Sequence, residues 1–367
     1  MENQNAPITN TLSETGAPLP DSPMPTAPTQ MAPIATPAAA AVSANEIRAG
    51  ATAPVAALCS AIRAQVKKAV VGQDEVIGQF LIAVLVGGHV LLEGVPGVAK
   101  TLASKTLAAS IGATFKRIQF TPDLMPSDVS GTSVFNMRTQ EFSLQKGPIF
   151  TDLLLADEIN RTPPKTQAAL LEAMQERRVT IDGVSHELSS LFTVFATQNP
   201  LDYEGTYPLP EAQVDRFLLK ILVDYPAPEA EIALLERIHR GFDAHELAES
   251  GIESVATPEM ILAARAAVKK VNVSEGMVRY IYQIVARTRN LATLSLGASP
   301  RAGIALLESS KALAAMNGRD YIVPEDVKTV APPVMRHRLM LRAESEMEGL
   351  RPDDIVKSVL GAVEVPR

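Results

Sequence analysis

Short apolar, strand-like runs constrain the fold of this chain most strongly. Helical patterns separate these runs, so strand-like and helical segments alternate along the middle of the sequence. Alternating βα units predict a parallel sheet that is covered by helices on both faces. The expected strands are "HVLLEG", "FKRIQF", "TDLLLADE", "LFTVFATQN" and "RFLLKILVDYP".

The segment "PPKTQAALLEAMQERR" is the clearest of the intervening helices. Thr162 is its expected N-cap, with Pro163 in the first turn. Leu170, Leu171 and Met174 fall on one face of this helix. We therefore expect that face to be buried.

The parts on either side of the alternating region differ from it in composition. Residues 1–44 are rich in Pro, Ala, Thr and Ser, and they cannot bury enough surface to offset their ordering entropy. Residues 45–69 have an amphipathic helical pattern, which Pro54 is expected to break. After "DYPAPEAE" the strand patterns stop, and residues 228–360 have helical patterns. The sequence predicts a disordered tail (1–44), an α/β domain (45–226) and an all-helical domain (227–367).

Composition narrows the functional classes. A net charge of −7 argues against a general nucleic-acid binder, which usually carries a basic excess. The single cysteine, Cys59, lies in the apolar pattern "PVAALCSAIRAQV", which favours a core position over a reactive thiol. No apolar run reaches the roughly 18–20 residues that a bilayer requires, and the first residues lack a secretory leader. We expect a cytoplasmic protein.

The stretch "EGVPGVAKT" (93–101) follows the first predicted strand and precedes a helix. Such a loop directs backbone N–H groups and the positive end of the helix toward an anion. The phosphate-binding signature is G-x-x-x-x-G-K-[ST], in which Lys contacts the β/γ-phosphates and the hydroxyl binds Mg²⁺. Gly94, Lys100 and Thr101 fit it, with Gly97 between them. Ala99 replaces the second signature glycine, and we expect it to have helical backbone angles.

Polar residues end two further strands of the predicted sheet. Asp157 and Glu158 follow four apolar residues in "LLLADE", and Gln198 and Asn199 end "FATQN". Ligands of open α/β sheets bind at the carboxyl ends of the strands. Asp157 is expected to hold Mg²⁺, Glu158 to polarise an attacking water, and Asn199 to hydrogen-bond the γ-phosphate or that water.

Two arginines are candidates for the additional positive charge that phosphoryl transfer requires. Arg216 lies in "EAQVDRF" before the last predicted strand, and Arg301 lies in "GASPRAG" at the start of a helix. A lone arginine is usually a solvated surface residue. The order of loop, acids, asparagine and arginines along the chain is what makes these two candidates.

These motifs together resemble those of an AAA+ ATPase and, within that group, the MoxR family. The resemblance covers roughly residues 50–345 and is carried by "GVPGVAKT", "LLLADEINR", "ATQNP", "LPEAQVDRF" and "LGASPRA". It implies an α/β P-loop NTPase domain with a parallel five-stranded sheet, followed by an all-helical lid domain. The roles that it implies are Walker A for Lys100 and Thr101, Walker B for Asp157 and Glu158, sensor 1 for Asn199, sensor 2 for Arg301, and an arginine finger toward the neighbouring subunit for Arg216.

The resemblance also implies the ligands, ATP and Mg²⁺. The segment "VVGQDEVI" matches the stretch that packs near the adenine in the family. Thr101 and Asp157 would hold the metal. The implied nucleotide-binding residues are Val71, Gly72, Gly94, Val95, Pro96, Gly97, Val98, Ala99, Lys100, Thr101 and Leu102.

Two predicted hairpins interrupt the βα alternation. "SVFNMRTQEFSLQKGPIF" (133–150) resembles the helix-2 insert of the MoxR and magnesium-chelatase branch. "RVTIDGVSHEL" carries Asp182-Gly183, the strongest short hairpin signal, and resembles the pore-facing hairpin that precedes sensor 1. Two ordinary surface hairpins remain the alternative.

The sequence therefore favours an ATPase that assembles into a ring, expected to be a hexamer, and that remodels or activates partner proteins. The resemblance implies a von Willebrand factor A-type domain partner and a client enzyme. Three alternatives remain: a magnesium-chelatase-type subunit, a nucleic-acid motor, and a nucleotide-gated scaffold. The acidic residues of "RVTIDGVSHEL" disfavour the motor, and Glu158 with Asn199 disfavours the scaffold.

Overall fold

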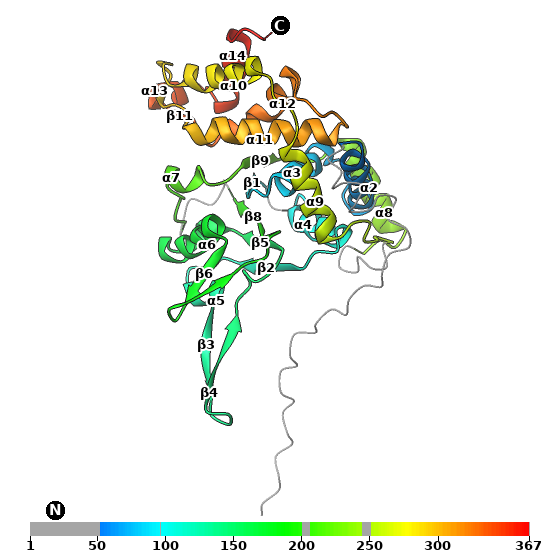
Figure 1. The fold of residues 1–367 in the computed structure, drawn as a ribbon, viewed down its shortest axis with the longest axis vertical. Coiled ribbons are helices and arrows are strands. Elements are labelled where there is room, and N and C mark those ends of the chain that lie inside the picture. The colour runs from blue at the N-terminus through cyan, green and yellow to red at the C-terminus, as the bar shows by residue number, and fades with distance from the viewer. Residues whose placement is uncertain (1–51, 96, 200–205, 244–250, 367) are drawn as a thin grey trace, which may run out of the picture. The chain divides into compact units, whose positions relative to one another are not determined.

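The structure is a computed structural model that describes residues 52–95, 97–199, 206–243 and 251–366 (Figure 1). The predicted tail, residues 1–44, lies outside this part of the chain. The predicted domain boundary at residue 226 stays a prediction. Along the described residues, no helix has both the length and the apolar character that crossing a bilayer requires.

A five-stranded parallel sheet forms the centre of the α/β part, as predicted. Its strand order is β2-β5-β8-β1-β9, so β1 lies between β8 and β9. Val90 of β1 pairs with Phe195 on one side and with Leu219 on the other. The strands are β1 (Val90–Gly94), β2 (Phe115–Gln119), β5 (Leu153–Asp157), β8 (Thr193–Gln198) and β9 (Leu219–Val223).

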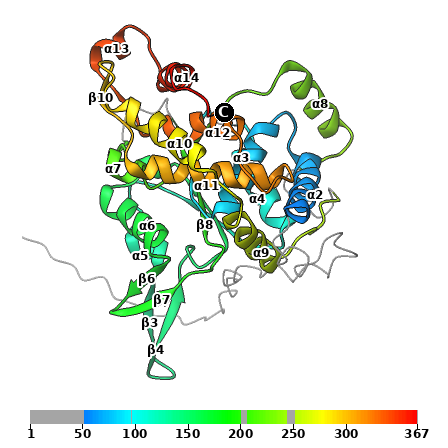
Figure 2. The ribbon, with the colours of Figure 1, turned by 45° about the horizontal axis from the view of Figure 1, so that its top comes forward.

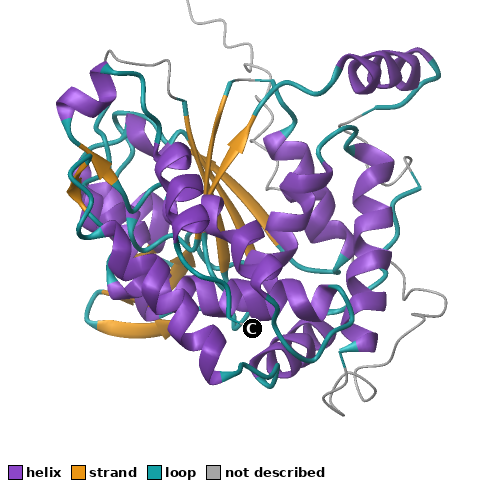
Figure 3. Ribbon diagram, turned by 90° about the horizontal axis from the view of Figure 1, so that it is seen from above, coloured by secondary structure: helices purple, strands orange, loops and turns teal. Residues whose placement is uncertain are grey.

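Successive residues of the strands pack into two different hydrophobic cores. Val90 and Leu92 of β1 belong to one core, whereas Leu91 between them belongs to the other. Side chains alternate between the faces of a strand, so this division means that both faces of the sheet are covered (Figure 3). The continuous apolar runs in the sequence follow from this double burial.

Helices pack on both faces of the sheet, and two of them begin differently from expectation. Pro54 lies in the first turn of α2 and does not break it, because the fixed φ of proline suits that position. The N-cap of α6 is Pro163, not Thr162, whose hydroxyl instead donates to the Thr121 carbonyl at 2.9 Å. The helices of this part are α2 (Ala53–Ala69), α3 (Asp74–Val86), α4 (Lys100–Ser110), α5 (Pro126–Ser130), the 3₁₀ turn η1 (Ile159–Arg161), α6 (Pro164–Glu176), α7 (Glu211–Val214) and α8 (Pro228–His239).

Both predicted hairpins are confirmed. One pairs β3 (Gly131–Asn136) with β4 (Glu141–Lys146), and the other pairs β6 (Arg178–Ile181) with β7 (Val184–Glu187). Asp182 and Gly183 have φ of 49° and 81°, as a two-residue turn of this type requires. The β3–β4 hairpin extends away from the sheet in both views (Figures 1 and 2), and it exposes four large apolar side chains, those of Val134, Phe135, Met137 and Phe142.

The C-terminal part is helical, as predicted, and α10, α11 and α12 lie side by side (Figure 2). It also contains a short antiparallel pair, β10 (Leu294–Leu296) and β11 (Met340–Leu341), which the sequence did not predict because neither segment is long enough to show an alternating pattern. The helices are α9 (Pro258–Lys269), α10 (Glu275–Thr288), α11 (Pro300–Met316), α12 (Pro324–Met335), α13 (Ala343–Met347) and α14 (Pro352–Ala362).

One of the two cores continues from the sheet into the C-terminal helices. It includes Leu92 of β1, Leu306 of α11 and Val330 of α12. Helix α11 contacts α2 and α3, and α12 contacts β9. Cys59 of α2 lies in the same core, as predicted, and burial raises the pKa of its thiol to about 12. The C-terminal helices therefore share their apolar contacts with the sheet.

His89, immediately before β1, is a fully buried polar side chain that links two strands and a helix. Its Nδ1 accepts a hydrogen bond from the Val194 N–H at 3.0 Å, so the ring proton lies on Nε2, which donates to the Met174 carbonyl at 3.1 Å. Burial, the largest cause, acts together with the charges of Arg177 and Arg265 to lower the pKa of His89 to about 4, against the opposing effect of the Met174 bond. His89 is therefore neutral in the folded protein.

The neutral state of His89 predicts a loss of stability in mild acid. Between the unfolded pKa near 6.5 and the folded pKa of about 4, the unfolded chain binds the extra proton, so the free energy of unfolding falls as pH falls. From pH 7 to pH 5 we expect this residue to contribute a loss of about 2 kcal/mol. Denaturant unfolding at both pH values should show a smaller loss for His89→Gln than for wild type. The exposed His239→Gln serves as control; an unchanged pH dependence in His89→Gln would contradict the assignment.

Candidate functional site

A cavity of about 570 Å³ lies at the carboxyl ends of β1, β5 and β8. It brings together the phosphate-loop residues, the two acids and the asparagine that the sequence singled out. The parallel direction of these strands explains the convergence, because their carboxyl ends meet at one edge of the sheet. The lining residues predicted from the sequence are Gly94, Gly97, Val98, Ala99, Lys100, Thr101, Leu102, Asp157, Glu158 and Asn199.

The backbone of the loop explains its residue types. A Cβ on Gly94 would lie 2.1 Å from the Val223 carbonyl oxygen, so glycine allows the close pairing of β1 with β9. Gly97 has φ of +84°, a region that glycine occupies without a steric penalty. The expectation for Ala99 was wrong: with φ 60° and ψ 22° it is left-handed, not helical, at the N-cap of α4. The glycine of the standard signature would relieve this strain.

Lys100 begins α4 and lies over its own loop. Its Nζ donates to the Gly94 carbonyl at 2.7 Å. Burial lowers the pKa of Lys100, and the carboxylates of Asp157 and Glu158 oppose that shift. A half-buried ammonium that faces two acids fits a point-charge contact to a phosphate near a metal ion.

Asp157 is the buried acid of the pair and is held from two sides. The Thr197 hydroxyl donates to Oδ1 at 3.0 Å, and Arg117 Nε donates to Oδ2 at 2.6 Å. Thr101 lines the same cavity. A carboxylate and a hydroxyl are the hard oxygen ligands that Mg²⁺ prefers, and Mg²⁺ takes its other ligands from phosphate and water. The residues therefore fit Mg²⁺, and no cluster of three or more metal-binding side chains occurs among the residues that the structure describes.

Glu158 is held in a strained backbone conformation at the end of β5. Its φ of 56° and ψ of 49° are left-handed, and its N–H donates to the Thr197 hydroxyl at 2.8 Å. Gln119 Nε2 donates to its Oε2 at 2.6 Å, and Arg161 Nε lies 3.1 Å from the same oxygen. Non-glycine residues in this conformation concentrate at functional sites, where the surrounding contacts hold them.

The sequence reasoning missed three residues of this cavity, namely Arg117, Gln119 and Thr197. The first two lie on β2, and they contact Asp157 and Glu158 because β2 pairs with β5. Polar residues at alternate positions of "FKRIQF" were the available signal. That signal becomes specific only once the neighbour of β2 in the sheet is known.

Several predicted nucleotide-binding residues lie away from the cavity lining. Gly72 packs against α8, since a Cβ there would lie 2.5 Å from the Cβ of Ala230. Val71 precedes it, and Val95 packs against the hydrophobic core. Pro96 lies outside the described residues. The adenine contact of Val71 and Gly72 stays a prediction.

The two candidate arginines lie at the opposite edge of the sheet. Arg216 and Arg301 line a second cavity of about 420 Å³ together with His89, which precedes β1. The five residues of β1, roughly 16 Å of strand, separate this edge from the phosphate loop. Arg216 Nη1 donates to the Leu171 carbonyl at 3.2 Å, and the side chain of Arg301 is 53% exposed. The structure thus brings the two arginines together but not to the Lys100 cavity of the same chain.

A phosphate loop, strand-end acids and a following helical part define an ATPase of the AAA+ class. Residues 89–219 match the model described as "ATPase family associated with various cellular activities (AAA)", and residues 286–359 match that of the AAA lid domain. We call the C-terminal helices α9–α14 the lid from here on.

Similar proteins narrow the class. The chain is 46% identical to Uncharacterized protein YeaC of Bacillus subtilis, over 82% of this chain and 92% of that protein. It is 43% identical to Chaperone MoxR1 of Mycobacterium tuberculosis, over 83% of this chain and 81% of that protein. A crystal structure from Cytophaga hutchinsonii, of a protein thought to be an ATPase, superposes with a TM-score of 0.79 at 41% identity, covering 88% of this chain and 97% of that one. The chain belongs to the MoxR family of AAA+ ATPases.

The strained backbone of Ala99 yields a stability prediction. Ala99→Gly should raise the free energy of unfolding by up to about 1 kcal/mol, because glycine adopts the left-handed conformation without strain. Ala99→Val should lower it by about 1 kcal/mol or more, since a β-branched residue is strained further there. Ala103→Gly, in the right-handed interior of the same helix, is the matched control and should lose about 1 kcal/mol. Denaturant titration measures all three; equal losses in both glycine variants would rule out the left-handed assignment.

Proposed function

We propose that this protein hydrolyses ATP as a ring, with Arg216 and Arg301 of one subunit completing the site of its neighbour. The observation that carries the proposal is the separation described above: the phosphate loop and the arginines lie at opposite edges of one sheet. A second copy that placed its arginine edge against the phosphate-loop edge would supply the missing positive charge. Repetition of such a head-to-tail contact closes a ring, and a hexamer is the form we expect.

Within one site, each residue has a separate role. Lys100 binds the β- and γ-phosphates, while Thr101 and Asp157 hold the metal. Mg²⁺, when bound, neutralises charge on the phosphate oxygens. Glu158 orients and polarises the attacking water, and Asn199 holds that water or the γ-phosphate. Arg216, from the neighbouring subunit, stabilises the charge that develops in the transition state.

The work coupled to hydrolysis, in our proposal, is the remodelling or maturation of partner proteins. The similarity to Chaperone MoxR1 supports this direction. The β3–β4 hairpin offers a protruding surface with exposed Phe135, Met137 and Phe142, which suits transient contact with apolar segments of another protein. A von Willebrand factor A-type partner, a client enzyme and a cytoplasmic setting belong to the same proposal.

Two variants of cavity residues should distinguish ATP binding from ATP hydrolysis. Glu158→Gln should retain ATP affinity but hydrolyse ATP roughly 10²–10⁴-fold more slowly, because the amide is a poor base. Lys100→Ala should lose ATP binding, since its charge on the phosphates is removed. Nucleotide titration and steady-state phosphate release measure the two effects. Glu275→Gln, an exposed acid of α10 paired with Arg279 at 2.6 Å and outside the cavity lining, is the control. Unchanged turnover in Glu158→Gln would exclude it as the base.

Action of Arg216 across the subunit interface predicts complementation. Arg216→Ala should bind ATP normally and hydrolyse it about 10³–10⁵-fold more slowly. Lys100→Ala has an intact arginine but no usable site. Mixed rings of the two variants should recover part of the rate, because the Lys100→Ala subunit presents its arginine to the intact site of its neighbour. Recovery should rise with protein concentration, as assembly does.

Subunit exchange, followed by energy transfer between labelled subunits, is the control for mixing. Arg279→Ala, an exposed arginine paired with Glu275 on α10, should hydrolyse ATP normally. If exchange occurs and mixing restores nothing, the role of Arg216 across the interface is wrong.

A further inference from the structure

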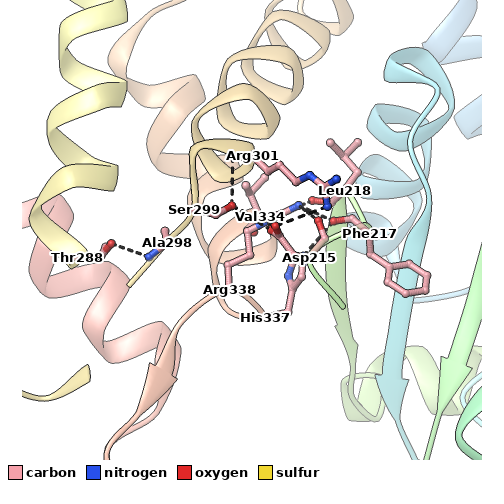
Figure 4. Close-up of polar contacts among 10 residues, drawn as sticks. All are labelled: Asp215, Phe217, Leu218, Thr288, Ala298, Ser299, Arg301, Val334, His337 and Arg338. Carbon is pink, nitrogen blue, oxygen red and sulfur yellow. Dashed lines mark hydrogen bonds and ion pairs between the residues drawn. The ribbon is translucent and has the colours of Figure 1, made fainter. Parts of the chain in front are cut away.

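Arg338 is a buried arginine that none of the roles above uses. It follows α12 in the lid, is 7% exposed, and lies beside the segment Asp215–Leu218 that carries Arg216 (Figure 4). A buried guanidinium requires an acceptor for each of its N–H groups, because an unsatisfied one carries a large desolvation penalty.

Every N–H group of this guanidinium has an acceptor. Nε donates to the Asp215 carboxylate at 2.8 Å. The remaining four N–H groups all reach backbone carbonyls. Nη2 donates to the carbonyls of Asp215 at 3.2 Å and Phe217 at 2.6 Å, and Nη1 donates to those of Leu218 at 3.2 Å and Val334.

The carbonyls that Arg338 contacts lie on both sides of Arg216. Asp215 precedes Arg216 and Phe217 follows it, so their bonds to one planar group fix the backbone from which the Arg216 side chain extends. The preceding residue, His337, adds a contact of 3.1 Å between its Nε2 and the Phe217 carbonyl. The residues that follow α12 therefore fix the backbone position of Arg216.

The Asp215 carboxylate extends the same contacts to the second arginine. The Ser299 hydroxyl donates to its Oδ2 at 3.1 Å, and Arg301 Nη1 lies 3.9 Å from that oxygen. Ser299 is the N-cap of α11, and its hydroxyl accepts the Arg301 N–H at 3.2 Å. One carboxylate thus connects the start of α11, the end of α12 and the Arg216 segment (Figure 4).

We propose that Arg338 is a positioning residue, which holds Arg216 and Arg301 as one unit and ties that unit to the lid. This inference rests on the proposed role of these arginines in the neighbouring site. A lid that shifts therefore carries both arginines with it, and the state of one subunit is passed to the site of the next. Lysine cannot replace Arg338, since an ammonium has three donors and no planar fork.

The test introduces Arg338→Lys either into the subunit that donates the arginines or into the subunit that offers the intact site, but not into both. The reference is the mixture of Lys100→Ala, which donates arginines, with Arg216→Ala, which offers an intact site. Adding Arg338→Lys to the donor subunit should reduce the recovered rate roughly 10²-fold, because small displacements of a catalytic group have effects of that size. Adding it to the Arg216→Ala subunit should leave the recovered rate near the reference, since that subunit supplies only the phosphate loop and the acids.

The asymmetry separates positioning from a general structural role, which would affect both placements alike. Arg265→Lys in the donor is the matched control. Arg265 is also a buried lid arginine bound to backbone carbonyls, those of Val84 at 2.7 Å and Ser190 at 2.7 Å, but it does not contact the Arg216 segment. The recovered rate with this control should stay near the reference.

Equal losses in both placements, or no loss in the donor placement, would overturn the role of Arg338 alone. Failure of the reference mixture despite subunit exchange would instead overturn the action of Arg216 across the interface, and the positioning role with it. In homogeneous Arg338→Lys rings, kcat should fall while nucleotide affinity holds. An affinity loss equal to the kcat loss would contradict positioning as well.

Discussion

Burial of the sheet on both faces is the constraint on which the rest of this structure depends. The central strands β5, β8 and β1 are packed on both sides and offer no exposed face for a charged group, so their polar residues lie at the strand ends. The outer strand β2 is more exposed and adds Arg117 and Gln119. Because the strands run parallel, the edge formed by their carboxyl ends and the edge formed by their amino ends carry different residues. The carboxyl edge gathers the phosphate loop with Asp157 and Glu158, and the amino edge gathers Arg216 near His89. Two chemically different edges on one sheet favour a head-to-tail contact between copies over a symmetric one.

The lid depends on the same burial, because its apolar contacts are continuous with one face of the sheet. A small helical domain joined only by a linker would be free to move relative to the sheet. Here α11 contacts α2 and α3, and the end of α12 is bonded to the segment that precedes β9. Polar contacts at Asp215 therefore lie beside an apolar interface that already restricts the lid. Together they couple the lid to the segment that carries Arg216.

The sequence predicted the sheet and the edge at which the acids gather, because the central strands β1, β5 and β8 are largely apolar runs with polar residues at their ends. Features that depend on strand register or on backbone angles could not be predicted from the sequence. Arg117 becomes a partner of Asp157 only through the pairing of β2 with β5. The left-handed angles of Ala99 contradict its residue type, and the loop around it imposes them. Arg338 stands in "MRHRL", where no pattern marks it, and only its set of acceptors gives it a role.

The buried thiol of Cys59 can serve as a probe for local opening of the core around α2. It is the only cysteine in the sequence, and it lies where α2 meets the core shared by the sheet and the lid. Burial excludes reagents and keeps the thiol protonated, so modification by a maleimide requires exposure of α2. The labelling rate then measures how often this core opens. Cysteines introduced on the surface would react first, which leaves the native thiol silent in labelling experiments on the folded protein.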